Sequence, residues 1–377
     1  VLLALSFSAF DLGFLAWISL APLLLALRGK TPRQGFRLGG MTGLLAFGGT
    51  LSWISTSLHS YGRIPLITAS VITLLLCLYC ALYPALFGAI VARLRQARPA
   101  LVVAAAPAAW TGLELARATV LTGFPWALLG YTQHAVLPVI QIADITGVYG
   151  VTYLIVLANI LVAELIEDRT RVIPAAAGCA IVIAVMVYGT VRMQQDNAAK
   201  GIQLSVVQGN IDQDKKWDPA YQAAVFSTYR RLTVKALDRK PDLVLWPETA
   251  TPFYFDGVAA SDVALTARLR TFVADSGTPL LFGSPRFERG TDRTYLLRNS
   301  AYLLDADGAT AAIYHKMHLV PLGEYVPLKK SVLFFLEKLV TAGGDFQPGT
   351  DYTVMKVRNR ESGRMCSVGT AICYEII

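Results

Sequence analysis

The hydrophobic residues in the first half of the chain form long runs that contain no charge. The cleanest runs lie between Arg63 and Arg93 and from Val172 to Val191. Further runs cover 1–10, 12–27, 38–62, 99–113 and 145–163. A helix needs about 20 apolar residues to cross the bilayer core, where a central charge costs about 2.5–3.5 kcal/mol. The pattern therefore predicts a transmembrane helical domain over residues 1–193, with about seven spans.

One apolar segment of this half is too irregular to form a span. Residues 121–147 are rich in apolar and aromatic side chains but are interrupted by Pro125, Pro138 and several glycines. Irregular backbone is not tolerated against lipid in the bilayer core. We expect an interfacial loop, with Trp126 and Tyr131 at headgroup level. Two roles are open for it: lining a route for lipid, or simply anchoring the domain.

The second half follows a different pattern. Short β-rich runs cover 202–210, 242–248, 278–284, 298–316 and 365–375. Asp307-Gly308, between two alternating runs, predicts a hairpin. Helical stretches extend from Pro219 to Leu237 and from Ser261 to Asp275, the second with Ser261 as its N-cap. Strands, helices and a hairpin in this order indicate an α/β domain over residues 201–377, joined to the first half by a short linker at 194–201.

Composition supports this division into two parts. Of the 377 residues, 54% are hydrophobic and 16% are charged, and the mean hydropathy is +0.48. Soluble proteins carry about 25% charged residues. Residues 1–200 hold 13 Lys/Arg and 7 Asp/Glu, whereas residues 201–377 hold 21 and 19. The first half is therefore unlike the core of a large soluble protein, and the second half has the charge content of a soluble domain.

The basic residues of the first half predict its orientation. They concentrate in three loops, at 28–37, 93–98 and 169–171. Counting spans places these loops on one side, which the positive-inside rule assigns to the cytoplasm. The span at 172–191 then exits, so the second half lies outside the cytoplasm. Val1 is an unusual first residue, and we expect the natural N-terminus to lie upstream of it.

Three residues with complementary chemistry end apolar strands of the second half. Glu248 follows the run LVLWP, Lys316 closes the second arm of the hairpin, and Cys373 ends the run GTAIC. A thiol nucleophile, a carboxylate that accepts its proton and a cation that stabilises an oxyanion together meet the needs of acyl transfer. Each residue alone has an ordinary explanation, as a core thiol or a solvated charge. Only the combination indicates a catalytic site.

The sequences around these residues resemble a known family. WPET at Glu248, YHKMHLVPLGEYVP at Lys316 and ICYE at Cys373 are similar to the three signature regions of the nitrilase (carbon–nitrogen hydrolase) superfamily. Within it, HLVPLGEYVP, FPWALLGY, QIADITGVYG and QGNIDQDKKWD resemble the apolipoprotein N-acyltransferases, and so does the membrane half. The resemblance covers nearly the whole chain. It implies a nitrilase-like αββα sandwich. It also implies transfer of an acyl chain from a phospholipid, through a Cys thioester, to the N-terminal amino group of an apolipoprotein's diacylglyceryl-cysteine.

The resemblance also assigns roles, residue by residue. Glu248 would be the general base, Lys316 the oxyanion stabiliser and Cys373 the nucleophile. Four further residues match positions that handle substrate or order the site in this family: Trp217, Glu324, Tyr374 and Glu375. Acylation followed by aminolysis gives ping-pong kinetics. The mechanism requires no cofactor and no metal, and the sequence has no Cys/His cluster with metal-ligand spacing.

The resemblance further implies a multi-pass protein of the bacterial cell inner membrane, with its catalytic domain facing the periplasm. Its partners would be a phospholipid acyl donor and a diacylated apolipoprotein acceptor; we expect a monomer and no nucleic acid. Family members continue well beyond the cysteine, whereas this chain stops four residues after Cys373. We therefore expect a catalytic domain that is incomplete at its C-terminus.

Rival functions remain open. A membrane-anchored nitrilase-type amidohydrolase would share the three residues but pass the acyl group to water, and the apolar 121–147 loop favours lipid instead. A transporter would need paired charges within its spans, which here contain few. The other cysteines give no disulfide in this reading. Cys77, Cys80 and Cys179 lie within expected spans, and Cys366 would share a strand with Cys373 but point to the opposite face.

Overall fold

The computed structural model describes residues 1–7, 10–62, 64–195, 201–216, 218–289, 295–321, 323–325 and 346–376. The chain forms two compact units, Val1–Asn197 and Ala198–Ile377. The first unit is helical, and the second contains all the described strands.

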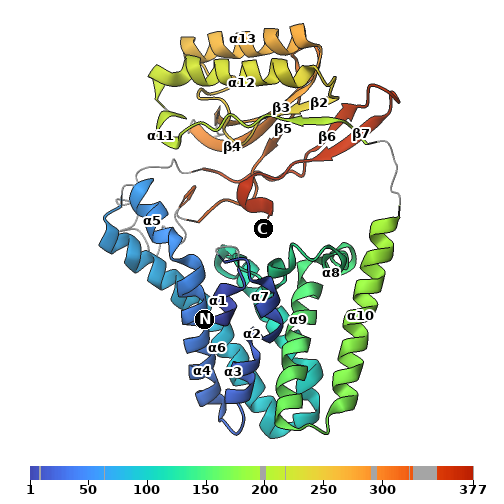
Figure 1. Ribbon diagram of the computed structural model, residues 1–377. Coiled ribbons are helices and arrows are strands. Elements are labelled where there is room, and N and C mark those ends of the chain that lie inside the picture. Colours follow the sequence, from blue (N-terminus) through green and yellow to red (C-terminus); the bar gives the residue numbers. More distant parts are fainter. Residues whose placement is uncertain are drawn as a thin grey trace. The chain divides into compact units, whose positions relative to one another are not determined.

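The longer helices of the first unit run roughly along one direction (Figure 1). The elements are α1 (Leu2–Leu5), η1 (Gly13–Leu15), α2 (Ala16–Ser19), α3 (Ala21–Ala26), α4 (Pro32–Leu51), α5 (Trp53–Ser60), α6 (Leu66–Ala97), η2 (Pro99–Leu101), α7 (Val102–Thr119), η3 (Val120–Thr122), η4 (Leu129–Gln133), α8 (Leu137–Ile140), α9 (Ala143–Glu167) and α10 (Val172–Gln194). Apolar side chains of α3, α6, α7 and α9 form its main core.

Within the described ranges, four helical segments are long and apolar enough to cross a membrane: α6, Pro99–Thr119, α9 and α10. They coincide with four of the charge-free runs. The run at 38–62 falls on α4 and α5, the run at 1–10 contains the short helix α1, and the run at 12–27 contains α2 and α3. The number of spans therefore stays a prediction. Many large hydrophobic side chains of these helices are exposed, such as Ile173 and Ile183 of α10, as expected for surfaces that face lipid.

Glycines allow α4 to lie directly against α6. Gly35 and Gly39 are one turn apart, and neither leaves room for a side chain. A Cβ atom at Gly39 would lie 2.0 Å from the carbonyl oxygen of Pro84, and one at Gly35 would lie 2.3 Å from that of Gly88. Small residues that admit close backbone contact are a common device in membrane helix packing, because lipid supplies no hydrophobic driving force.

A buried asparagine joins the short N-terminal helices to α9. The side-chain oxygen of Asn159 accepts hydrogen bonds from the main-chain N–H groups of Leu20 and Ala21, at 2.7 and 3.1 Å. Its amide nitrogen donates to the carbonyl oxygens of Ala16 and Ile155, both at 2.8 Å. One side chain thus satisfies backbone groups that the break between α2 and α3 leaves without helical partners.

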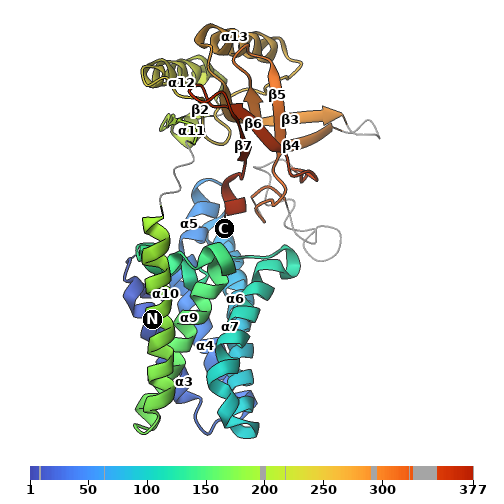
Figure 2. The same cartoon turned by 90° about the vertical axis from the view of Figure 1, so that its right-hand side faces the viewer.

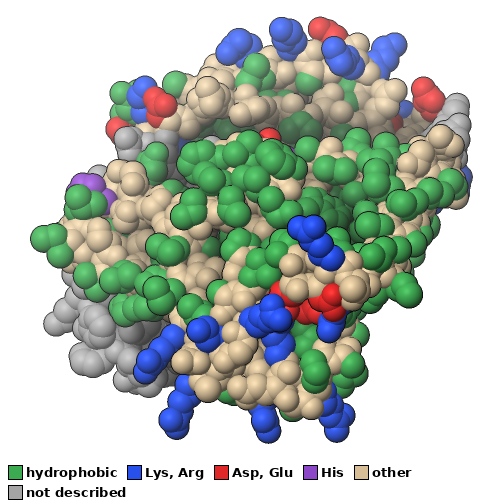
Figure 3. Space-filling model, turned by 60° about the horizontal axis from the view of Figure 1, so that its bottom comes forward, with side chains coloured by type: hydrophobic (Ala, Val, Ile, Leu, Met, Phe, Trp, Pro, Cys, Tyr) green, Lys and Arg blue, Asp and Glu red, His purple; other side chains and the backbone are tan. Residues whose placement is uncertain are grey.

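The three basic loops lie at the same end of the helical unit. Arg95 binds Glu164 at 3.1 Å, and Arg171 binds the same carboxylate. The side chain of Gln96 donates to the carbonyl oxygen of Lys30 at 3.2 Å. Figure 3 shows Lys and Arg side chains gathered at this end, beside hydrophobic side chains along the flank of the unit. The positive-inside rule can assign these loops to the cytoplasm only if all three lie on one side, and in the structure they do.

The second unit contains a mixed sheet with helices on one face. Its elements are β1 (Leu204–Val206), α11 (Gln213–Lys216), η5 (Pro219–Tyr221), α12 (Gln222–Leu237), β2 (Leu243–Leu245), α13 (Ala260–Ser276), β3 (Leu280–Arg289), β4 (Tyr295–Leu304), β5 (Thr310–His315), β6 (Val354–Arg358), β7 (Met365–Gly369) and η6 (Cys373–Ile376). The strand order is β1-β2-β3-β4-β5, parallel from β1 to β3 and antiparallel from β3 to β5.

Each face of this sheet is covered by a different layer. Helices α12 and α13 lie side by side over one face (Figures 1 and 2), where Phe226 and Leu269 share a core with strand residues such as Val244. The antiparallel pair β6–β7 packs on the opposite face, where Met355 and Val357 join a second core with residues of β2 to β5. The layers are therefore helix, sheet and a second sheet.

The expected hairpin is confirmed, and two local expectations are wrong. Leu304 pairs with Thr310 across the Asp307-Gly308 turn. Helix α13 begins at Ala260 with Ala259 as its N-cap, so Ser261 is not the cap; the preceding extended backbone ends at Ala259. Strand β7 ends at Gly369, where its partner β6 begins, so Cys373 is not on that strand.

Candidate active site

Glu248 lies on a tight turn that leaves β2. The strand ends at Leu245, and the next residue after Glu248, Thr249, has a positive φ of 50°. This conformation is unfavourable for a β-branched residue and is typical of functional turns. Gly283 on β3 makes the turn possible, because a Cβ atom there would lie 2.6 Å from the Cα atom of Glu248.

Lys316 follows β5 directly and is almost completely buried, with 1% of its side chain exposed. Its ammonium nitrogen lies 3.6 Å from Oε1 of Glu248. It lies 3.1 and 3.0 Å from the two carboxylate oxygens of Glu324. A buried ammonium group is stable only when such partners compensate its lost hydration. The structure therefore places Lys316 between the two expected carboxylates.

Asn299 is a site residue that the sequence analysis missed. Its amide nitrogen donates to Glu248 at 2.6 Å and to Glu324 at 2.9 Å, so one side chain bridges both carboxylates. Asn299 lies in the middle of β4, beside Lys316, whose main-chain N–H donates to the Asn299 carbonyl oxygen at 2.8 Å. The register of the hairpin, which pairs Ser300 with His315, is the signal that could have located it.

Cys373 begins the short helix η6 with a positive φ of 52°. Its thiol lies close enough to the carboxylate of Glu248 and the ammonium group of Lys316 for both groups to influence its pKa. Partial burial raises the pKa of the Cys373 thiol, and the negative charge of Glu248 raises it further, whereas Lys316 lowers it. The resting thiol thus keeps its proton and holds it against a carboxylate.

The two residues after the cysteine anchor its loop. Oε1 of Glu375 accepts hydrogen bonds from the hydroxyl of Tyr314 and from the main-chain N–H of Met317, both at 2.7 Å. Its other oxygen accepts from the N–H of Ile372 at 2.8 Å. The ring of Tyr374 is buried, 5.4 Å from that of His318. Glu375 thereby ties the Cys373 loop to the segment that carries Lys316.

The structure brings six of the seven expected site residues into one region. Glu248, Lys316 and Cys373 interact directly, Glu324 binds Lys316, and Tyr374 and Glu375 hold the cysteine loop. Trp217 lies outside the described residues. Across the described ranges, no group of three His, Cys, Asp or Glu side chains is suited to hold a metal ion. Cys366 and Cys373 are both free thiols. The expectation that they share a strand is wrong, because β7 ends at Gly369.

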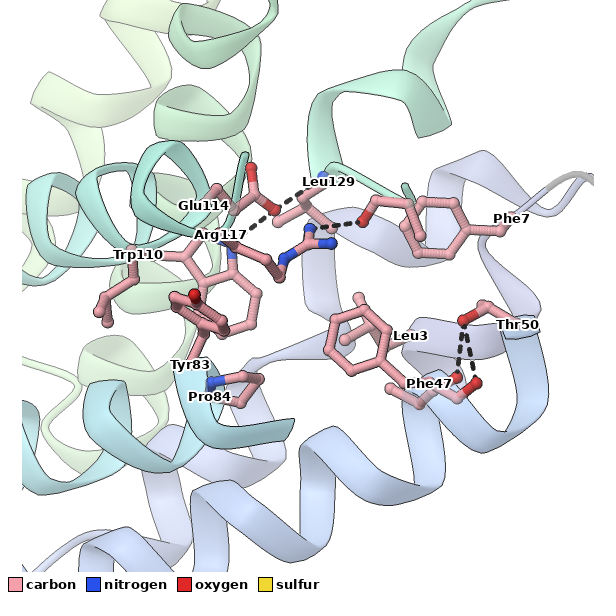
Figure 4. Close-up of a pocket in the computed structure, with 13 residues that line it drawn as sticks. Leu3, Phe7, Phe47, Thr50, Tyr83, Pro84, Trp110, Glu114, Arg117 and Leu129 are labelled. Atoms are coloured by element: carbon pink, nitrogen blue, oxygen red, sulfur yellow. Dashed lines mark hydrogen bonds between the residues drawn. The ribbon is translucent and has the colours of Figure 1, made fainter. Parts of the chain in front are cut away.

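The helical unit has a separate buried polar cluster, on α7 (Figure 4). Glu114 and Arg117 are 4% and 2% exposed and border a cavity of about 30 Å³. The guanidinium group of Arg117 donates to the carbonyl oxygens of Phe124 and Trp126, and Glu114 accepts from the main-chain N–H of Leu129 at 2.9 Å. This pair fixes the irregular segment after α7. Its position at a membrane interface stays a prediction.

A membrane helical part and an α/β domain in which a thiol, a carboxylate and a buried ammonium group meet define a membrane-bound enzyme of the nitrilase type. Comparison with known families agrees. The family profile "Apolipoprotein N-acyltransferase N-terminal domain" matches residues 1–161, and "Carbon-nitrogen hydrolase" matches residues 203–377. The fold is thus a membrane helical part plus a nitrilase-like domain, as the resemblance implied.

Proteins named apolipoprotein N-acyltransferase match all or nearly all of the chain. The apolipoprotein N-acyltransferase of Geobacter metallireducens is 41% identical over 383 residues, which cover 100% of this chain and 71% of the relative. That of Methylococcus capsulatus is 32% identical over 354 residues, covering 93% and 67%. The chain belongs to the apolipoprotein N-acyltransferase family.

Among solved structures, the chain is similar to an amidase from Nesterenkonia sp.. It is 22% identical, with a TM-score of 0.30, and the match covers 46% of this chain and 56% of the amidase.

Proposed function

We propose that this protein transfers a fatty acyl chain from a phospholipid, through a thioester on Cys373, to the α-amino group of the diacylglyceryl-cysteine of apolipoproteins. Family membership supports acyl transfer in lipoprotein maturation. The observation that carries the mechanism is that the Cys373 thiol, the Glu248 carboxylate and the buried ammonium group of Lys316 interact in one site.

In the first half-reaction the Cys373 sulfur attacks the ester carbonyl of the phospholipid. Glu248 accepts the thiol proton as the C–S bond forms, which is the role of a general base that already shares this proton. Lys316 donates a hydrogen bond to the oxyanion, since its buried ammonium group lies beside the Glu248 carboxylate and interacts with the Cys373 thiol. The C–O bond then breaks, and Glu248 returns the proton to the leaving lysophospholipid alkoxide.

In the second half-reaction the lipoprotein amine attacks the thioester. Glu248 accepts a proton from the nitrogen, the C–N bond forms and the C–S bond breaks. The Cys373 sulfur leaves as thiolate and recovers its proton from Glu248. An amide replaces the thioester, and the free thiol of the resting site is restored. Two half-reactions separated by a covalent intermediate give ping-pong kinetics.

We also propose the side of the membrane on which the reaction takes place. The basic loops that share one end of the helical unit support a cytoplasmic position for that end. Counting from there, the chain after α10 lies on the periplasmic side of a bacterial inner membrane. Both substrates would then be lipids or lipid-bearing peptides of that side.

The thioester tests the proposal. The full-length protein is incubated in membranes without acceptor lipoprotein, and the peptide that contains Cys373 is examined by mass spectrometry. We expect one fatty acyl group on Cys373, removable by neutral hydroxylamine, and an equal amount of released lysophospholipid. Cys373→Ser should abolish the adduct, because a hydroxyl is a weaker nucleophile, and Cys366→Ser should not change it. A protein that hydrolyses short amides but never carries a lipid-derived acyl group would instead be an amidohydrolase.

A further inference from the structure

A second lysine contacts the main chain of Glu248. Lys216 is the last residue of α11, and its ammonium nitrogen donates a hydrogen bond to the main-chain carbonyl oxygen of Glu248 at 3.2 Å. The side chain is partly buried, and this burial lowers the pKa of Lys216, while the negative charge of Glu248 opposes the change. Burying an ammonium group is unfavourable, so a lysine in this position requires a compensating interaction, which the Glu248 carbonyl oxygen provides.

The carbonyl that Lys216 binds belongs to the strained turn after β2. Before this carbonyl in the chain, the carbonyl oxygen of Pro247 accepts a hydrogen bond from the N–H of Gly283 at 3.2 Å. After it, the N–H of Ala250 donates to the carbonyl oxygen of Gly283 at 2.9 Å. These bonds fix the two neighbours of the Glu248–Thr249 pair to β3. Among the described residues, the hydrogen-bond partner of the intervening Glu248 carbonyl is Lys216.

The neighbouring lysine shows that this placement is specific to Lys216. Lys215 lies on another side of the same short helix, where its ammonium group binds Asp212 at 2.8 Å and 53% of its side chain is exposed. Two adjacent lysines of equal chemistry therefore have different surroundings. Lys215 provides a matched control for any test of Lys216.

We propose that Lys216 is a positioning residue for the general base: its ammonium group holds the Glu248 carbonyl and so keeps the strained turn, and the carboxylate it carries, directed at the Cys373 thiol. This inference rests on the function proposed above. A carboxylate that accepts a proton must lie within hydrogen-bond reach of it, so a small relaxation of the turn lowers the rate without removing any group that reacts.

The test measures the rate of thioester formation on the full-length protein in micelles over a range of phospholipid concentrations. Rates are expressed per reactive Cys373, titrated with iodoacetamide in a background without the other native cysteines. For Lys216→Met we expect the maximal rate to fall roughly tenfold, with little change in the half-saturating phospholipid concentration. Lys216→Arg should recover most of the rate, because a guanidinium group also donates to a carbonyl. Lys215→Met should match the unsubstituted protein.

Other results would contradict either the role of Lys216 or the proposed function. Equal rates per titrated thiol for Lys216→Met and the unsubstituted protein would overturn the inference. An increased half-saturating concentration at an unchanged maximal rate would also overturn it, because Lys216 would then bind the lipid phosphate. Failure of the unsubstituted protein to form any thioester would instead remove the proposed function itself. If Lys216→Met gives no folded protein, Lys216→Arg and Lys216→Gln decide, with recovery expected only for Arg.

Discussion

Glu248 acts on the Cys373 thiol in two opposed ways. Its negative charge and its hydrogen bond both raise the pKa of the thiol, beyond the increase caused by burial. A raised pKa means less thiolate at a given pH, yet the proposed mechanism assigns the same carboxylate to accept the proton during attack. Resting reactivity and catalytic competence should therefore respond in opposite directions when Glu248 is neutralised.

Glu248→Gln tests this opposition. Removing the negative charge lowers the pKa of Cys373, so more thiolate is present at neutral pH and iodoacetamide should alkylate the residue severalfold faster. Thioester formation from phospholipid should fall by at least about a hundredfold, because the proton acceptor is gone. Alkylation is followed by mass spectrometry over a pH series in a Cys366→Ser background. Slower alkylation in the variant would contradict the electrostatic role of Glu248.

At the scale of single residues, the sequence located the groups that carry distinctive local motifs. Glu248, Lys316 and Cys373 were identified because each follows an apolar run within a recognisable string. Asn299 was not, since a polar residue within a strand is unremarkable until the pairing of β4 with β5 places it beside Lys316. Lys216 was missed for the same reason: its contact with Glu248 joins segments 32 residues apart.

Among the elements, the approach of β3 to the turn after β2 determines the position of the base. A Cβ atom at Gly283 would lie 2.5 Å from the main-chain nitrogen of Thr249 and 2.6 Å from Cα of Glu248. Gly283→Ala should therefore displace the turn, lower the stability of the domain by roughly 1–3 kcal/mol and reduce thioester formation. Thermal unfolding in detergent and the acylation rate are the measurements. Gly369→Ala on β7 is the control, because nothing lies within 4 Å of its added Cβ.

In the helical unit, the corresponding element is the break between α2 and α3. Asn159→Leu removes four hydrogen bonds to main-chain groups and leaves the N–H groups of Leu20 and Ala21 buried without their acceptor. We expect a loss of roughly 1–3 kcal/mol in stability, seen as a lower midpoint of thermal unfolding in detergent. Thr190→Ala on α10 should have little effect, because this exposed hydroxyl binds only its own helix. An unchanged midpoint for Asn159→Leu would show that α9 does not hold the N-terminal helices.

Element types were predicted better than their ends. Alternation and apolar runs identified the longer helices and every described strand except β6, including the 307–308 hairpin, because these signals are local; β6 and α11 were not predicted. The end of β7 at Gly369 depends on where its partner β6 begins, and the start of α13 depends on backbone conformation rather than on a capping side chain. The run at 12–27 was also not divided into α2 and α3, since the break between them is stabilised by the distant Asn159.

At the scale of the whole molecule, the orientation in the membrane is open to direct measurement. The proposal places Lys30 in the cytoplasm and Asp218 in the periplasm. Single cysteines at these positions, in a background without native cysteines, are treated with a membrane-impermeant maleimide in intact spheroplasts. We expect labelling of Asp218→Cys before lysis and of Lys30→Cys only after it. Labelling of position 218 only after lysis would reverse the arrangement.

The order of the site residues along the chain has a consequence for biosynthesis. A ribosome makes the chain from its N-terminus, so Glu248, Asn299 and Lys316 exist before Cys373 is added. The cysteine loop is bound through Glu375 to the segment that follows β5, and these earlier residues therefore form the surface on which it docks. Cys373 also follows every described strand, so a nascent chain has no thiol at this position until those strands have been made. It cannot be acylated there by surrounding lipid until the groups that control the reaction have been made.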